Sequence, residues 1–181
     1  MQNDLSDFLA NGTRLSEGST NWGGSMPLQI TLYLCNKLPP LEYVSSVRAI
    51  VFQERSVLVI TQENGQMYIT PGGRVQQGEA PLETLKRELL EETGWTLHKT
   101  KLLGCMHLHH LAPKPENYPY PYPDFLWLIY TAEADAFISS AIIPDDYVST
   151  SGFKPIEEIK NLPLDNEQSS LLLLDAALRL R

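Results

Sequence analysis

The sequence predicts an α/β protein of one domain, because strand-like and helix-like patterns follow one another within a chain of 181 residues. Runs rich in β-branched residues at 44–52 and 57–61 have the composition of strands. Asn64-Gly65 is the dipeptide most typical of a tight β-hairpin turn. Residues 81–93 then carry leucines at helical spacing.

The first 42 residues are predicted to be a partly ordered N-terminal extension, and residues 43–181 the main domain. Residues 1–25 are rich in Gly, Ser, Asn and Thr without sustained periodicity, so we expect them to be loosely ordered. Residues 28–34 alternate enough for a strand or a short helix, which Pro39-Pro40 would end.

Three strands are expected at the start of the main domain. Residues 44–52 and 57–61 are separated by the polar Gln53-Glu54-Arg55, as expected for adjacent antiparallel strands. A third strand is expected over residues 66–70, directly after the hairpin signal. Pro71-Gly72-Gly73 then breaks the chain into a loop.

The helix over 81–93 has clear signals at both ends. Pro81 suits the first helical position, and Gly94 suits a left-handed cap just past the last one. Leu82, Leu85 and Leu89 are expected to form its buried stripe.

The rest of the chain predicts two more strands and one more helix. The strands are expected within 102–111 and 125–134, where apolar and β-branched residues are frequent. The helix is expected over about 166–180, with leucines and alanines that would pack on the core.

Composition excludes several classes of function. The net charge is −8, so the chain lacks the clustered Lys and Arg that long nucleic acids require. No apolar run approaches the roughly 20 residues of a membrane span, and we expect a cytoplasmic protein. Cys35 and Cys105 have no metal-ligand spacing, so two reduced thiols are expected. A homodimer is compatible with the sequence but not indicated by it.

A set of glutamates on the helix carries the chemistry. Glu88, Glu91 and Glu92 stand at i, i+3 and i+4, so their carboxylates share one face and repel one another. A hard cation with oxygen ligands would remove that repulsion. Mg²⁺ fits best, with Mn²⁺ as a substitute. Such a cation would also reconcile an acidic protein with a small phosphorylated substrate.

The spacing of this region resembles the signature of the Nudix hydrolase superfamily. From Gly73 the sequence runs five residues to Glu79, seven more, and then Arg87-Glu88-Leu89-Leu90-Glu91-Glu92-Thr93-Gly94. The resemblance covers roughly 44–180 and implies a three-layer α/β/α sandwich with a mixed β-sheet.

The resemblance also implies a role for each matching residue. Glu88 and Glu92 would be the main metal ligands, Glu91 a ligand or water activator, and the Gly72 carbonyl a further ligand. Arg87 and Glu79 would form an ion pair that orients them. Arg87 also has Glu83 and Glu91 at i−4 and i+4, which makes this role sterically reasonable.

The implied reaction is hydrolysis of a phosphoanhydride bond in a nucleoside diphosphate linked to another group, by metal-activated water. The substrate stays open among nucleoside triphosphates, ADP-ribose, nucleotide sugars and dinucleoside polyphosphates. The alternative is a catalytically silent domain of the same fold that binds nucleotides or regulates a partner. A degraded glutamate set would indicate that alternative, and this chain keeps all three.

Several residues outside the signature are candidates for substrate contact. Thr61-Gln62-Glu63 stands where many relatives have a basic residue, so phosphate contact would fall to Arg48, Arg74 or the metal alone. Tyr118, Tyr120 and Tyr122 alternate with prolines, either to stack on a base or to form a rigid surface loop.

The remaining polar residues have less specific signals. His107, His109 and His110 are interpreted as ordinary strand residues rather than zinc ligands, because no third ligand has a supporting spacing. At most one of them is expected to contact the substrate. The candidates for a general base outside the signature are Glu133, Asp145, Asp146, Glu157 and Glu158. Glu133 is also a candidate for substrate contact.

Overall fold

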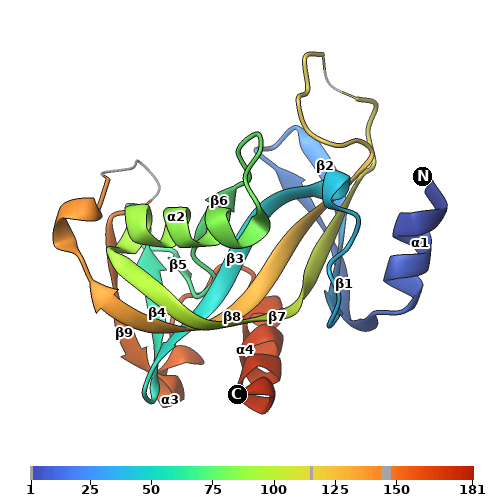
Figure 1. The fold of residues 1–181 in the computed structure, drawn as a ribbon. Coiled ribbons are helices and arrows are strands. Elements are labelled where there is room, and N and C mark those ends of the chain that lie inside the picture. Colours follow the sequence, from blue (N-terminus) through green and yellow to red (C-terminus); the bar gives the residue numbers. More distant parts are fainter. Residues whose placement is uncertain (1, 115, 144–147) are drawn as a thin grey trace.

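The apolar and β-branched runs pair into one curved sheet with helices on both faces (Figure 1). The computed structural model describes residues 2–114, 116–143 and 148–181, and within them the sheet has nine strands. The elements in chain order are α1 (Gln2–Ala10), β1 (Thr13–Trp22), β2 (Met26–Leu34), η1 (Leu41–Tyr43), β3 (Val44–Gln53), β4 (Ser56–Thr61), β5 (Met67–Tyr68), β6 (Gly72–Arg74), α2 (Pro81–Thr93), β7 (Trp95–His110), β8 (Asp124–Phe137), η2 (Ser139–Ala141), β9 (Thr150–Pro155), α3 (Ile156–Ile159) and α4 (Glu167–Leu180).

The sheet is mixed, as the sequence predicts. Its strand order is β1-β2-β7-β8-β3-β4-β5, with β6 added to β3 and β9 added to β4. β3 runs parallel to β8, whereas the other strand pairs are antiparallel. Because β3 and β8 are distant in sequence, their pairing draws the two halves of the chain together.

Side chains that alternate along β3 divide the core between the two faces. Val47, Ala49 and Val51 pack in one cluster with residues of α1 and α2, whereas Ile50 and Phe52 pack in another with residues of α3 and α4. Helices therefore cover both faces, and the expected three-layer sandwich is confirmed (Figure 1).

The third predicted strand is shorter than expected. β4 pairs with β3 at its start and with β5 at its end. β5 contains only Met67 and Tyr68. Nearer the start of β3, the same edge of the strand pairs with Gly72–Arg74 of β6 in place of β4. The predicted loop over Pro71-Gly72-Gly73 therefore contains a short strand.

The expectation of a loosely ordered segment over residues 1–25 is wrong. It contains α1 and β1, and β1 pairs with β2, the strand alternative for residues 28–34. β1 is mostly exposed at the edge of the sheet, so main-chain hydrogen bonds form it and no apolar alternation marks it. Leu5 of α1 is buried in the core. The division at residue 42 stays a prediction.

The later strands and the last helix are confirmed, with longer strands than expected. β7 spans sixteen residues and β8 fourteen, and α4 begins just after Asn166. Cys35 and Cys105 are free thiols. Cys35 directly follows β2, and Cys105 lies in the adjacent strand β7. Among the described residues, no helix is both long and apolar enough to cross a membrane.

We predict that Gly104→Ala destabilises the sheet between β2 and β7. A Cβ at Gly104 would overlap the Tyr33 carbonyl and lie 3.1 Å from the Leu34 Cα, and a paired backbone cannot move aside cheaply. The overlap should cost about 2 kcal/mol or more and lower the melting temperature by about 4 °C or more. Gly18→Ala is the control, since nothing lies within 4 Å of its Cβ. Equal melting temperatures for the two variants would contradict the close approach.

Candidate active site

Helix α2 is fixed at both ends by residues that helix termini favour. Pro81 stands in its first turn, and the Glu83 carboxylate accepts a hydrogen bond from the Ala80 amide (3.0 Å). At the other end Gly94 has a φ of 75° and donates its amide to the Leu90 carbonyl (2.9 Å). The register of the helix, and with it the position of each acidic side chain, is therefore set.

The buried face of α2 differs from the predicted stripe at one residue. Leu85 and Leu89 are fully buried, and each contributes about 1.5–3 kcal/mol. Leu82 is 39% exposed, so its prediction as a core residue is wrong. Pro81, Leu85 and Leu89 recur every four residues along the buried face, and Leu82 is rotated about 60° from Leu85.

The strand β6 lies between β3 and α2, and glycine is required at position 72. Gly72 has a φ of 132°, and a Cβ there would overlap the Val47 carbonyl. A Cβ on Gly73 would overlap the Glu88 carboxylate. Ser46 Oγ donates to the Gly73 carbonyl (2.8 Å) and fixes the strand from the other side.

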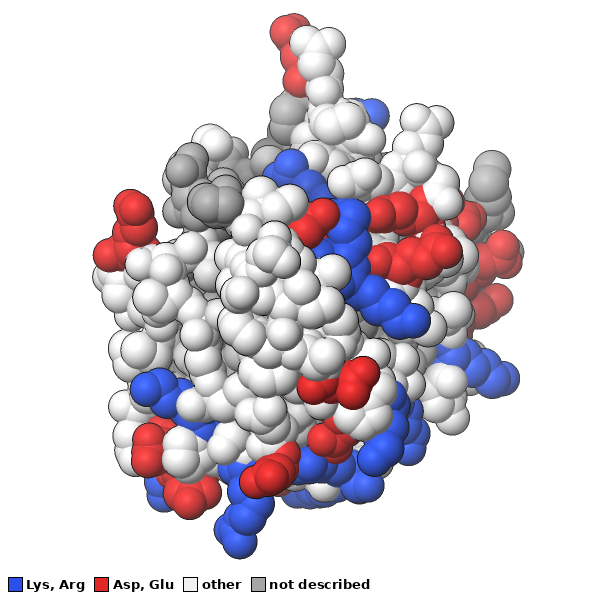
Figure 2. Space-filling view, turned by 60° about the vertical axis from the view of Figure 1, so that its left-hand side comes forward, with Lys and Arg blue, Asp and Glu red and all other residues white. Residues whose placement is uncertain are grey.

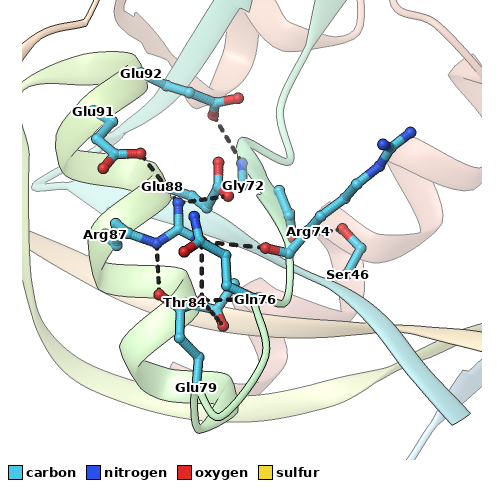
Figure 3. A network of polar contacts seen from close by, with 11 residues as sticks. Ser46, Gly72, Arg74, Gln76, Glu79, Thr84, Arg87, Glu88, Glu91 and Glu92 are labelled. Carbon is cyan, nitrogen blue, oxygen red and sulfur yellow. Dashed lines mark hydrogen bonds and ion pairs between the residues drawn. The ribbon is translucent and has the colours of Figure 1, made fainter. Parts of the chain in front are cut away.

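The three helix carboxylates share one face of α2, as predicted from their spacing, and this face is turned towards β6 (Figure 3). Glu92 Oε2 accepts a hydrogen bond from the Gly72 amide (2.9 Å). Glu88 Oε1 and Glu91 Oε2 both accept from Arg87 Nη1, at 2.8 and 3.1 Å. The structure thus brings the glycine pair and the carboxylates into one unit.

Arg87 also forms a bidentate ion pair with Glu79, with Nε to Oε1 at 2.6 Å and Nη2 to Oε2 at 2.9 Å. Glu79 Oε2 further accepts from Thr84 Oγ1 (2.8 Å) and the Gln76 amide (3.1 Å). These contacts, chiefly that of Arg87, hold the pKa of Glu79 at about 2. The bond to Glu79, with help from Glu88, likewise raises the pKa of Arg87 above its usual range. Both side chains therefore stay charged at neutral pH.

The donor chemistry of this unit suits a hard divalent cation. Carboxylates are the ligands that Mg²⁺ and Mn²⁺ prefer, and two of their oxygens already converge on the single cationic nitrogen Arg87 Nη1. Within residues 2–114, 116–143 and 148–181, no three acidic, histidine or cysteine side chains are arranged around a metal position. A cation would therefore require Glu88 and Glu91 to exchange their contact with Arg87 for one with the metal.

Arg48 of β3 lies beside the same unit, directly across from Gly72. Its Nη1 donates to the Thr70 carbonyl (3.2 Å), and its guanidinium stacks 4.5 Å from the ring centre of Trp127. Its buried Nε has no hydrogen-bond partner in the described part of the chain. Burial lowers the pKa of Arg48, opposed by Glu92 and by a further nearby carboxylate. The unsatisfied donor is a suitable contact for an anion.

The three tyrosines fall into two groups. Tyr118 is hydrogen-bonded to His110 Nε2 (2.9 Å), and Tyr122 donates to the Ala112 carbonyl (2.8 Å). The ring of Tyr120 instead lies 5.0 Å from the guanidinium carbon of Arg74, the residue that follows Gly73. Of the three, Tyr120 is the one that contacts the candidate site.

His107 and His109 are joined by a residue that the sequence did not single out. Asp124 Oδ1 contacts His107 Nε2 at 2.8 Å and His109 Nδ1 at 2.7 Å. Burial alone would raise the pKa of Asp124, but the bonds to His109 and His107 outweigh it and lower that pKa. No local pattern marks Asp124 or Trp127, because their partners come from other strands.

Three of the remaining candidates have contacts away from the Gly72–Gly73 unit, and two lie outside the described residues. Glu133 is held by Arg181, with Nε to Oε1 at 2.8 Å. Glu157 and Glu158 are exposed on α3, which begins beside Arg55 at the turn between β3 and β4. Asp145 and Asp146 lie outside the described residues.

Comparisons with known proteins agree with this geometry. A family model described as the NUDIX domain matches residues 42–174. "Putative ADP-ribose pyrophosphatase YjhB" of Bacillus subtilis (strain 168) is 29% identical over 76 residues, which is 42% of this chain and 36% of that relative. The chain therefore spans about a third of the relative's length.

Two solved structures share the fold. One is the Bacillus subtilis pyrophosphohydrolase BsRppH, with a TM-score of 0.61, 19% identity, and coverage of 91% of this chain and 94% of that one. The other is a NUDIX hydrolase from Nitrosomonas europaea, with a TM-score of 0.56, 18% identity, and coverage of 76% and 88%.

We predict that Glu79 makes stability depend on pH only in acid. Its folded pKa of about 2 lies below its ordinary value of 4.5, so the unfolded chain takes up the proton first as the pH falls. The stabilisation by Glu79 is complete above about pH 4.5 and is lost as the pH falls towards about 2. The melting temperature of Glu79→Gln should therefore lie below that of the wild type by a constant amount at neutral pH, and this gap should narrow in acid. Glu63→Gln is the control, because it removes the same charge at an exposed residue. A difference in melting temperature between Glu79→Gln and the wild type that widens in acid would contradict the ion pair.

Proposed function

The chain belongs to the NUDIX domain family, and from this premise we propose that it is a hydrolase that uses a divalent cation to cleave a phosphoanhydride bond. The substrate is a nucleoside diphosphate linked to another group. The observation that carries the proposal is the hydrogen bond from the Gly72 amide to Glu92, together with the close approach of the Glu88 carboxylate to Gly73, where a Cβ would overlap it. These two features join the carboxylates and the loop in one unit.

Glu88, Glu91 and Glu92, with the Gly72 carbonyl, are the residues that would hold the cation, Mg²⁺ first and Mn²⁺ as a substitute. When bound, the cation neutralises phosphate oxygens and lowers the pKa of the attacking water. The contacts of Arg87 support this assignment, because its bidentate bond to Glu79 uses Nε and Nη2 and does not depend on the Nη1 contacts with Glu88 and Glu91. Glu91 is the most exposed of the three acids that pair with Arg87, which suits it to accept a proton from water.

Arg48 and Arg74 are the proposed phosphate contacts, since they flank the glycine pair from β3 and β6. A small substrate also agrees with the surface, because acidic and basic side chains lie next to one another on the face in Figure 2 rather than in an extended basic field. Nothing in the net charge of −8 favours a long nucleic acid. The name of the relative from Bacillus subtilis makes ADP-ribose the first compound to test.

The purified protein should release a nucleoside monophosphate or phosphorylated remainder from one class in a panel of nucleoside triphosphates, ADP-ribose, nucleotide sugars and dinucleoside polyphosphates. Hydrolysis should require Mg²⁺ or Mn²⁺ and stop with EDTA. Phosphate released after phosphatase treatment measures it. Nucleotide binding without hydrolysis of any member would instead support the catalytically silent alternative.

We predict that millimolar Mg²⁺ or Mn²⁺ raises the melting temperature. A ligand at one hundred times its dissociation constant stabilises the fold by about 2.7 kcal/mol, which corresponds to about 5–10 °C for a chain of this length. The increase should disappear in a variant that combines Glu88→Gln and Glu92→Gln. An unchanged melting temperature of the wild type through the titration would argue against a cation at these carboxylates.

We predict that Glu88→Gln, Glu91→Gln and Glu92→Gln each lower kcat by about a hundredfold or more, because glutamine keeps the shape but loses the charge. Glu83→Gln is the matched control on the same helix, since a glutamine still caps the Ala80 amide. Circular dichroism should be unchanged in all four variants. Half of the wild-type rate in any of the first three would remove that residue from the mechanism.

A further inference from the structure

His110, the last residue of β7, anchors the tyrosine–proline segment at 118–123. The side chain is buried, and the rings of Tyr118, Tyr122 and Phe125 surround it at centroid distances of 5.0, 5.2 and 5.4 Å. Its Nε2 is hydrogen-bonded to the Tyr118 hydroxyl, and its amide donates to the Pro123 carbonyl (2.9 Å). The segment is therefore attached to the sheet through side chain and main chain.

A continuous series of contacts leads from His110 to Arg74. The rings of Tyr118 and Tyr120 meet edge to face at 5.4 Å, and the Arg74 guanidinium lies over the Tyr120 ring. Burial lowers the pKa of His110 and raises that of Tyr118, so both are neutral at pH 7 and can share one hydrogen bond. Arg74 is the first charged side chain on this path.

Arg74 joins this path to the candidate active site. Its main chain belongs to β6 and pairs with Ser46 of β3, and its carbonyl accepts a hydrogen bond from Arg87 Nη2 (3.2 Å). Its side chain is exposed and forms no ion pair with any described residue. A guanidinium with one face on a ring keeps its N–H edges for an anion, and the ring limits its rotamers before binding.

We propose that Tyr120, backed by Tyr118 and His110, is a positioning residue that holds Arg74 on a phosphate group of the substrate. This inference rests on the proposed function and names what the tyrosines act on. The alternative is stacking of the tyrosines on the base. It is less consistent with the structure, because Tyr118 is turned to His110 and Tyr122 to the Ala112 carbonyl. Tyr120 then acts through the arginine and not on the substrate.

A double-mutant cycle on the Michaelis constant tests the proposal. Arg74→Gln should raise KM about tenfold, as expected for a lost hydrogen bond to a charged group. Tyr120→Leu should raise KM about two- to fivefold, the value of an exposed cation–π contact. In the Arg74→Gln background Tyr120→Leu should have no further effect, whereas kcat should stay within about twofold throughout. An equal increase of KM in both backgrounds would mean that Tyr120 contacts the substrate itself, and would overturn the proposal.

The anchor is tested in the same way. Tyr118→Phe removes the hydrogen bond to His110 but keeps the ring, so KM should rise by a smaller factor than in Tyr120→Leu and again not in the Arg74→Gln background. Tyr33→Phe, which loses a hydroxyl on another part of the sheet, should leave KM unchanged. An increase of KM in Tyr118→Phe that persists without Arg74 would contradict the path through Tyr120.

Binding of inorganic pyrophosphate, measured by calorimetry with and without Mg²⁺, separates this proposal from the proposed function. Weaker binding in both Arg74→Gln and Tyr120→Leu supports the arginine site even when no compound of the panel is hydrolysed. Hydrolysis with an unchanged KM, together with unchanged pyrophosphate binding in both variants, overturns the arginine site and leaves the proposed hydrolase in place.

Discussion

The contact between the Gly72–Gly73 strand and helix α2 is the constraint on which the rest of the site depends. A side chain at Gly73 would displace the Glu88 carboxylate, and one at Gly72 would strike the main chain of β3. Glu92 then ties the helix to the strand through the Gly72 amide. The helix α2 is also packed against the sheet through the buried Leu85 and Leu89, which adds to the attachment between the helix and the strand. The carboxylates are thereby held at a backbone rather than spread along a solvated helix face.

Charge compensation around Arg87 explains how these acids remain close together. Each pair of like charges at helical spacing costs a few tenths of a kcal/mol, which one guanidinium offsets by bonding Glu79, Glu88 and Glu91 at once. The bidentate bond to Glu79 is the stronger one by geometry, with contacts of 2.6 and 2.9 Å. The single nitrogen shared by Glu88 and Glu91 marks the position where positive charge is favoured. This is the electrostatic basis for expecting a cation there.

Two further arginines flank the glycine pair, and each lies over an aromatic ring. Arg48 stacks on Trp127 of β8 and is partly buried, whereas Arg74 stacks on Tyr120 and is exposed. The rings come from segments more than forty residues away in sequence, carried to the site by the parallel pairing of β3 with β8 and by the contacts of His110. The strands β3 and β6 therefore supply arginine side chains to a site whose carboxylates come from α2.

The sequence by itself determined the elements whose pattern is local. Pro81 and Gly94 set the ends of α2, helical spacing put Glu88, Glu91 and Glu92 on one face, and β-branched runs marked β3 and β4. Only the tertiary structure decided the features whose partners are distant. The exposed β1 forms because β2 offers a free edge, Leu82 is exposed because of how α2 lies on the sheet, and the contacts of Arg48 with Trp127 and of Arg74 with Tyr120 depend on strand order. Periodicity records which side of an element is buried, but the neighbours of each side chain are set by pairings between residues far apart in the chain.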